Sequence, residues 1–302
     1  MPVSADFSNS VRRLSENEVG SMEHRPFGPT KREVPVIGQG TWYIDENDRA
    51  TVVSALRRGL DLGMTHIDTA EMYGAGAAET IVGEAIAGRR DGVFLVSKVL
   101  PQHASRSRTV EACEASLQRL KTNRLDCYLL HWRGSYRLEE TIAGFEDLQE
   151  DGKILSWGVS NFDVGELREA AKIAPDGHMV CNQVLYHLKE RTVEDAVLPW
   201  CERHGVAMVA YSPFGHRRFP SPHTAGGRVL QQIAAAHQAT PRQVALRFLV
   251  RSPAVFTIPK TSSAEHAAEN AGAGGLHLTK AELAQIDEAF PRPAGHHPLP
   301  TL

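Results

Sequence analysis

The sequence predicts a single (β/α)8 barrel with an N-terminal β-hairpin cap and extra C-terminal helices. From about residue 34 almost to the end of the chain, short apolar runs alternate with amphipathic helical patterns. This alternation is typical of parallel strands joined by right-handed crossovers. Eight such runs are present, and eight parallel strands can close a barrel.

The predicted strands are mostly apolar and are bounded by turn residues. They are Val34–Trp42, His66–Ala70, Val93–Val99, Leu125–Trp132, Ile154–Asn161, Met179–Tyr186, Val206–Pro213 and Val255–Lys260. Helices with an apolar stripe are predicted at Ala50–Gly63, Thr109–Lys121, Ser262–Ala273 and Thr279–Phe290. The last of these opens with a Thr-x-x-Glu capping box. A turn at Phe27, Gly28 and Pro29 predicts a hairpin over His24–Pro35 that closes the N-terminal face.

An open, doubly wound sheet is the alternative arrangement of the same elements. Such a sheet usually carries G-x-G-x-x-G after its first strand. The nearest match, at Gly74 and Gly76, follows the second strand and has Glu79 where the third glycine belongs. The barrel is therefore favoured.

Composition narrows the class of protein further. The formal net charge of -3 over 302 residues gives no reason to expect a nucleic acid partner. No apolar run has the length of a membrane helix, so no membrane partner is expected. Four dispersed cysteines without a CxxC pair indicate a reduced, cytoplasmic protein. Residues 1–23 are expected to form a loose, flexible arm, and residues 24–302 a single barrel domain.

Four reactive side chains fall at or after the ends of three adjacent predicted strands, and a barrel carries its chemistry at the C-terminal ends of its strands. Asp68 and Lys98 end the second and third predicted strands, His131 lies near the end of the fourth, and Tyr73 follows the second. A tyrosine has an ordinary pKa near 10 and is a poor acid at neutral pH. A nearby ammonium lowers that pKa, and a carboxylate can orient the ammonium. The set therefore suits protonation of a carbonyl during reduction.

The chain resembles the aldo-keto reductases over about residues 24–290. The matching segments are GQGTW (38–42), HIDTAEMYG (66–74), LVSK (95–98), LDCYLLHW (125–132), GKILSWGVSNF (152–162), CNQVLYH (181–187), VAYSPFG (209–215), TPRQVALRFLV (240–250) and IPKTSSAEHAAEN (258–270). The resemblance implies an NADP(H)-dependent enzyme that reduces aldehyde and ketone carbonyls to alcohols by hydride transfer. It also implies a monomer.

The resemblance implies roles residue by residue. Tyr73 would be the general acid, Lys98 the group that lowers its pKa, Asp68 the partner of Lys98, and His131 the group that orients the carbonyl. The implied NADPH-binding residues are Gly40, Thr41, Trp42, Asp68, Ser160, Asn161, Gln183, Tyr211, Ser212, Pro213, Phe214, Gly215, Lys260, Thr261, Ser262, His266, Glu269 and Asn270. The implied substrate pocket comprises Trp42, Tyr73, His131, Trp132 and Phe214.

Two positions depart from the pattern. Many relatives have Arg where this chain has His266, and a neutral imidazole binds phosphate less well than a guanidinium. Lys260 still favours NADPH, with NADH bound at lower affinity. Arg133 stands where many relatives have proline, and lies in solvent or meets an acidic substrate. The long polar loop Phe214–Gly227, which contains Arg217 and Arg218, is a candidate lid.

Two other functions compete with the reductase. A regulatory sensor on the same scaffold, like the channel-associated β-subunits, would bind the cofactor with little turnover. A metal-dependent barrel hydrolase needs closely spaced His, Asp and Glu ligands. The chain has no H-x-H or H-E-x-x-H pair at a strand end, and His296 and His297 lie in a Pro-rich tail. No metal is therefore expected.

Overall fold

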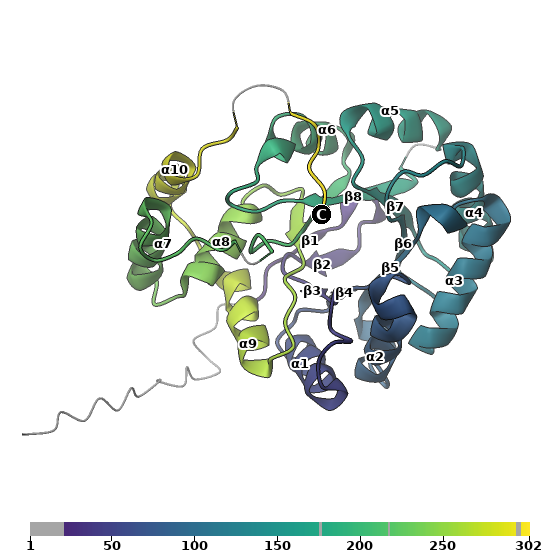
Figure 1. Ribbon diagram of the computed structural model, residues 1–302, viewed down its shortest axis with the longest axis horizontal. Coiled ribbons are helices and arrows are strands. Elements are labelled where there is room, and N and C mark those ends of the chain that lie inside the picture. Colours follow the sequence, from purple (N-terminus) through teal and green to yellow (C-terminus); the bar gives the residue numbers. More distant parts are fainter. Residues whose placement is uncertain (1–20, 175–176, 217, 294–296) are drawn as a thin grey trace, which may run out of the picture.

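The computed structural model describes residues 21–174, 177–216, 218–293 and 297–302, and the predicted barrel is confirmed. Its main sheet runs in the order β3 to β10, with eight strands each parallel to the next. Two parallel bridges, Ile37 to Thr257 and Gly40 to Lys260, close the sheet on itself. Figure 1 shows the strands at the centre and the helices around them.

The barrel strands are β3 (Gln39–Gly40), β4 (His66–Asp68), β5 (Phe94–Val99), β6 (Cys127–Leu130), β7 (Trp157–Ser160), β8 (Met179–Leu185), β9 (Ala207–Tyr211) and β10 (Val255–Thr257). The helices are α1 (Arg49–Asp61), α2 (Ala77–Ala85), α3 (Arg106–Leu120), α4 (Leu138–Glu150), α5 (Val164–Ile173), α6 (Val197–His204), α7 (Ala225–Ala236), α8 (Pro241–Leu249), α9 (Ala264–Gly272) and α10 (Lys280–Ala289). Within the described ranges, no helix is both long enough and apolar enough to cross a membrane.

The predicted hairpin is present as β1 (His24–Pro26) paired antiparallel with β2 (Glu33–Pro35). Residues 1–20 of the predicted arm lie outside the described residues. The end of that arm, residues 21–23, is held in place. Met22 packs against the main core, and the Glu23 amide donates to the carbonyl of Gly274 over 3.2 Å.

The first and last predicted strands are shorter in the structure. Val34 and Pro35 belong to the hairpin, and β3 keeps two residues of the predicted Val34–Trp42. Proline lacks an amide donor, which explains the break after residue 35. The same reason ends β10 at Thr257, two residues before Pro259.

The extra helices are not all C-terminal. α9 completes the eighth strand–helix unit, and α10 follows it with the predicted capping box between Thr279 and Glu282. The other extra helix, α7, lies between β9 and α8, and the sequence analysis did not predict it. α10 packs on α7, so the two additions form one layer outside the ring.

Two apolar cores hold the fold, because side chains alternate between the two faces of a strand. The larger core lies between the strands and the helices. The smaller one fills the barrel interior and comprises Phe27, Val34, Phe94, Val96, Cys127, Leu129, Val180, Cys181, Ala207, Val209, Phe256 and Ile258. Phe27 reaches this interior from the hairpin, so the hairpin seals the N-terminal end of the barrel.

His66 lies fully buried at that sealed end. Its ring meets Phe27 and Phe94 edge-on, with centroids 5.8 and 5.4 Å away. Neither ring nitrogen has a hydrogen-bond partner. Burial, assisted by the charge of Lys98, lowers the pKa of His66 to about 3.

We expect His66 to make stability depend on pH. The folded pKa lies below the unfolded value of about 6.5, so between pH 6.5 and 3 the unfolded chain binds a proton that the folded protein does not. Its contribution is complete above pH 6.5 and is lost as pH falls. Replacing His66 by Leu should reduce the slope of unfolding free energy against pH by about 1.4 kcal/mol per unit in this window. Urea unfolding across pH 4.5–6.5 checks this, with the exposed His223→Leu as control. Equal slopes for the wild type and His66→Leu would contradict it.

Candidate active site

The cleft at the C-terminal ends of the strands is built by strand alternation. On β5, β6, β8 and β9 the last interior apolar residue is followed two positions later by a polar one, because both point into the barrel. Val96 leads to Lys98 on β5, and Cys181 leads to Gln183 on β8. The same step places His131, Ser160 and Tyr211 at the ends of β6, β7 and β9. A polar layer therefore lies directly on an apolar barrel filling.

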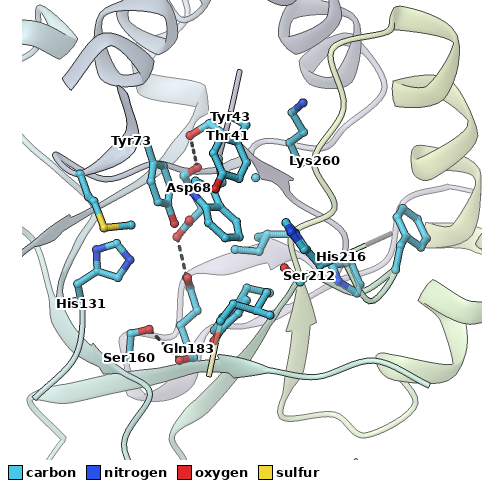
Figure 2. Close-up of a pocket in the computed structure, with 18 of the residues that line it drawn as sticks. Thr41, Tyr43, Asp68, Tyr73, His131, Ser160, Gln183, Ser212, His216 and Lys260 are labelled. Carbon is cyan, nitrogen blue, oxygen red and sulfur yellow. Dashed lines mark hydrogen bonds between the residues drawn. The ribbon is translucent and has the colours of Figure 1, made fainter. Parts of the chain in front are cut away.

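Asp68, Lys98 and Tyr73 form one connected chain in this layer. The Lys98 ammonium donates to Asp68 Oδ1 over 2.5 Å, to the Thr69 carbonyl over 2.8 Å and to the Tyr73 hydroxyl over 3.2 Å. Both partners of the ion pair are buried, with side-chain exposures of 0% and 2%. Gln183 Nε2 donates to the other oxygen of Asp68 over 2.7 Å, and Figure 2 shows this bond crossing the cleft floor.

Tyr73 is brought over Lys98 by a tight turn after β4. The turn, Tyr73–Gly76, places Gly74 at a φ of 55°. A Cβ on Gly74 would lie 2.3 Å from Asp45 Oδ2, so glycine is needed both for the backbone conformation and for the close approach. The turn leaves Tyr73 facing the cleft with its hydroxyl against the ammonium.

The charges of this chain oppose the cost of burial. Burial alone would lower the pKa of Lys98, but Asp68 and Tyr73 outweigh it and hold that pKa above its ordinary value. Burial raises the pKa of Tyr73, and the Lys98 charge and hydrogen bond offset part of that rise. The phenol is therefore neutral and protonated at neutral pH, with a cation beside its oxygen.

His131 faces Tyr73 from β6 with ring centroids 5.7 Å apart. Burial, with the Lys98 charge second, lowers the pKa of His131 to about 2. The imidazole is thus neutral at physiological pH. Its Nδ1 is buried without a hydrogen-bond partner, and its backbone carbonyl accepts from Asn161 Nδ2 over 3.1 Å.

Amide and hydroxyl groups also line the cleft. Asn161 Oδ1 accepts from the Tyr211 hydroxyl over 2.9 Å. Asn161 has a positive φ of 62°, as do Tyr43 (61°), Ser212 (50°) and His216 (42°). Non-glycine residues rarely adopt this conformation, and such residues cluster at functional sites. The rim of the cleft therefore carries local backbone strain.

The polar layer opens into a cleft of about 800 Å³, within the range of roughly 300–1,000 Å³ typical of ligand pockets. Of the sequence-predicted residues, it is lined by Gly40, Thr41, Trp42, Asp68, Tyr73, His131, Trp132, Ser160, Asn161, Gln183, Tyr211, Ser212, Pro213, Phe214 and Lys260. All five predicted substrate-pocket residues are among these. Lys98 lies beneath the lining.

The remaining predicted cofactor residues lie outside this lining. They are Gly215, Thr261, Ser262, His266, Glu269 and Asn270. Ser262 Oγ contacts Asn47 Oδ1 over 3.1 Å, which joins the loop before α9 to the loop after β3. Glu269 accepts from Thr240 Oγ1 over 2.7 Å, and Asn270 is buried on α9.

Sequence reasoning missed seven lining residues, namely Tyr43, Glu46, Asn47, Met72, His216, Ile258 and Leu302. Tyr43, Met72 and His216 each directly neighbour a predicted site residue, so a wider window around those positions would have found these three. Trp42 stacks on Tyr43 at 4.5 Å and on His216 at 5.5 Å between ring centroids. This second stack joins the β3 loop to the loop after β9, whose residue 217 lies outside the described residues. Leu302 is remote in sequence and carried no motif.

The cleft fits a nicotinamide dinucleotide phosphate in the chemistry of its lining. Lys260 lines it as an exposed cation. Burial lowers the pKa of Lys260, which Glu46 and Asp45 partly offset. Tyr211 offers an aromatic ring, and Ser160, Asn161 and Gln183 offer polar groups at one wall. Figure 2 shows Tyr73 and His131 on one side of the cleft and Lys260 on the other.

Two further features considered from the sequence are Arg133 and a metal site. Arg133 pairs with Glu169 over 2.8 Å, so it meets an acid of α5 and is absent from the lining of the cleft. No cluster of three or more His, Cys, Asp or Glu side chains suited to a metal ion occurs among the described residues.

The barrel and its cleft define a class of protein: an α/β-barrel enzyme with a tyrosine hydroxyl held by a buried ammonium. The model of the aldo/keto reductase family matches residues 36–290. Methylglyoxal reductase YeaE of Escherichia coli (strain K12) is 45% identical over 264 residues, 87% of this chain and 93% of that protein. A 9,11-endoperoxide prostaglandin H2 reductase of Trypanosoma cruzi (strain CL Brener) is 33% identical, over 84% of this chain and 87% of its own length.

Comparison with solved structures supports the same family. An aldo-keto reductase from Klebsiella pneumoniae in complex with NADPH matches with a TM-score of 0.87 and 44% identity, over 93% of this chain and 99% of that one. The chain belongs to the aldo/keto reductase family and is an oxidoreductase. The predicted family is confirmed.

We expect Lys98 to support stability because it neutralises Asp68. Replacing Lys98 by Met leaves a buried, unpaired carboxylate and should cost about 3–5 kcal/mol of unfolding free energy. Adding Asp68→Asn removes that charge, so the double variant should be more stable than Lys98→Met alone. Urea unfolding of the two single variants and the double variant measures the coupling. Strictly additive losses would show that the pair does not act as a unit.

Proposed function

We propose that this protein reduces small aldehydes and 2-oxoaldehydes with NADPH, with Tyr73 as the proton donor. The observation that carries the proposal is the hydroxyl of Tyr73, held by the buried Lys98–Asp68 pair at the floor of a cofactor-sized cleft. The methylglyoxal reductase relative and the NADPH-bound structural neighbour support the substrate class and the cofactor.

In this mechanism NADPH supplies the hydride to the carbonyl carbon. Tyr73 donates its proton to the carbonyl oxygen as negative charge develops there. The resulting phenolate lies 3.2 Å from the Lys98 ammonium, which stabilises it in a site that water reaches poorly. Asp68 keeps Lys98 protonated and fixed in direction. The buried ion pair thus makes a weak acid usable at neutral pH.

His131 orients the substrate carbonyl. Because its pKa of about 2 keeps it neutral, it can donate one hydrogen bond to the carbonyl oxygen without competing with Tyr73 as an acid. Its edge-on contact with the Tyr73 ring holds both groups on one side of the cleft. A carbonyl oxygen placed between them meets two donors.

The cofactor occupies the remainder of the cleft in this proposal. Tyr211 would stack on the nicotinamide, and Ser160, Asn161 and Gln183 would hold its carboxamide. Gln183 would have this role in addition to its bond to Asp68. The loop from Ser212 to Gly215 would cover the pyrophosphate, and Lys260, Thr261 and Ser262 would hold the 2′-phosphate. Glu269 and Asn270 are assigned to the adenine, although Glu269 already accepts from Thr240.

The proposed substrate pocket is aromatic. Trp42, Trp132 and Phe214 form its walls, and Met72 adds a flexible apolar contact. Trp132 is about one-third exposed, at 36%, so the outer wall is open to solvent. Such walls suit short carbonyl compounds. In a 2-oxoaldehyde, the second carbonyl oxygen would remain near the polar layer.

The reductase is tested by NADPH oxidation at 340 nm with methylglyoxal, simple aldehydes and diketones. We expect turnover with NADPH. Tight NADPH binding without turnover on any of these compounds would contradict the proposal and favour the sensor alternative.

NADPH should bind more tightly than NADH, because Lys260 lines the cleft and has no ion-pair partner among the described residues. Fluorescence titration at low salt gives both dissociation constants. Equal values would count against a 2′-phosphate site at Lys260.

Replacing Tyr73 by Phe should reduce kcat by about 100-fold or more, the contribution expected of a general acid. NADPH binding should remain close to that of the wild type, because the ring and its contacts persist. Steady-state kinetics and a binding titration on the same preparation separate the two effects. A near-normal kcat would show that another group donates the proton.

A further inference from the structure

Arg242 lies behind the cleft-lining residue Phe214 and packs against two aromatic rings. It is the second residue of α8. Its guanidinium carbon lies 4.9 Å from the ring centre of Phe214 and 4.8 Å from that of Phe219. The two rings meet edge-to-face at 5.7 Å. Phe214 itself lines the cleft, so the guanidinium is one side chain away from the ligand space.

The charge of Arg242 is not neutralised by a neighbour. Within the described ranges, no carboxylate lies within ion-pair distance of it. Several other exposed arginines are paired, for example Arg49 with Glu84 and Arg106 with Asp147. Arg242 therefore has its N–H groups available, while its flat face rests on aromatic carbon.

The start of α8 is fixed against α9. Thr240 Oγ1 donates to Glu269 Oε1 over 2.7 Å, and Gln243 Nε2 donates to the Glu269 carbonyl over 2.8 Å. Figure 1 shows α8 and α9 as neighbours. α9 begins four residues after Lys260. Lys260 and Arg242, neither of which has an ion-pair partner among the described residues, thus belong to segments that meet at α9.

Lys260 lines the cleft. One ammonium does not balance the charge of a phosphate monoester. The first turn of α9 contributes His266, an exposed side chain at a position where the family resemblance implies arginine. A guanidinium binds phosphate through two parallel N–H donors, which an imidazole cannot supply. Arg242 offers a guanidinium that no carboxylate engages within the described residues.

We propose that Arg242 is a specificity-determining residue that binds the 2′-phosphate of NADPH from the α8 side, in the role that His266 cannot fill. The inference rests on the proposed use of NADPH. The rings of Phe214 and Phe219 orient the guanidinium before binding, so less side-chain freedom is lost when the phosphate arrives.

Binding measurements on the full chain test this without turnover. The probes are NADPH, NADH, adenosine 2′,5′-bisphosphate and 5′-AMP, and the variants are Arg242→Gln and Arg242→Lys. Arg108→Gln is the matched control, because Arg108 is an exposed arginine on α3 and its loss changes the net charge equally. Thermal unfolding verifies that each variant is folded.

Arg242→Gln should weaken NADPH and adenosine 2′,5′-bisphosphate by roughly tenfold, the effect of losing a contact worth about 1.4 kcal/mol. NADH and 5′-AMP should bind as to the wild type, and Arg242→Lys should fall between the two. The variant should also show a weaker dependence of NADPH binding on salt.

Two results would overturn the inference alone. Unchanged NADPH binding in Arg242→Gln would show that the guanidinium does not reach the phosphate. Equal weakening of NADPH and NADH would show that Arg242 positions the Phe214–Phe219 loop instead. A wild-type chain that binds neither NADPH nor adenosine 2′,5′-bisphosphate would overturn both this inference and the proposed function.

Discussion

The buried ion pair between Lys98 and Asp68 is the constraint on which the site depends. An ammonium in the barrel interior is costly unless a carboxylate and further acceptors surround it. Asp68, the Thr69 carbonyl and the Tyr73 hydroxyl supply these acceptors. Because Gln183 satisfies the second oxygen of Asp68, the pair reaches across the barrel from β4 and β5 to β8. The same contacts that stabilise the charge therefore fix the positions of the reactive groups.

The barrel provides a rigid base for this pair. Its interior below the polar layer is filled by apolar side chains and closed at the other end by Phe27 of the hairpin. Such an interior screens charge weakly, so after burial the Lys98 charge is the next cause of the pKa shifts of Tyr73 and His131. At the opposite end of the barrel, His66 is buried without a hydrogen-bond partner for its ring. The Lys98 charge also contributes to lowering the pKa of His66.

The loops above the strands complete the cleft. Trp42 from the β3 loop stacks on His216 from the β9 loop, and Ser262 joins the β3 loop to the start of α9. Several rim residues adopt positive φ without being glycine. Rigid strands thus carry the reactive groups, and strained loops shape the space around them, a division common to barrel enzymes.

The sequence by itself determined the barrel and the polar residues at its strand ends. Period-two alternation in β5 and β8 is local, so Lys98 and Gln183 could be assigned to the inward face without coordinates. The family resemblance then predicted most of the cleft lining between Gly40 and Lys260. Pro35 and Pro259 could also have signalled the shortened strands, since each removes an amide donor.

Tertiary structure alone decided the partners of these residues. The bond from Gln183 to Asp68 joins positions 115 apart in the chain, and no local pattern encodes such a pairing. The entry of Leu302 into the cleft lining, the stacking of His216 on Trp42 and the placement of Arg242 between two rings arise in the same way. They depend on how loops and helices pack around the closed sheet, and packing is set by contacts between distant segments. The sequence therefore specified which groups face the cleft, and the fold specified what each of them touches.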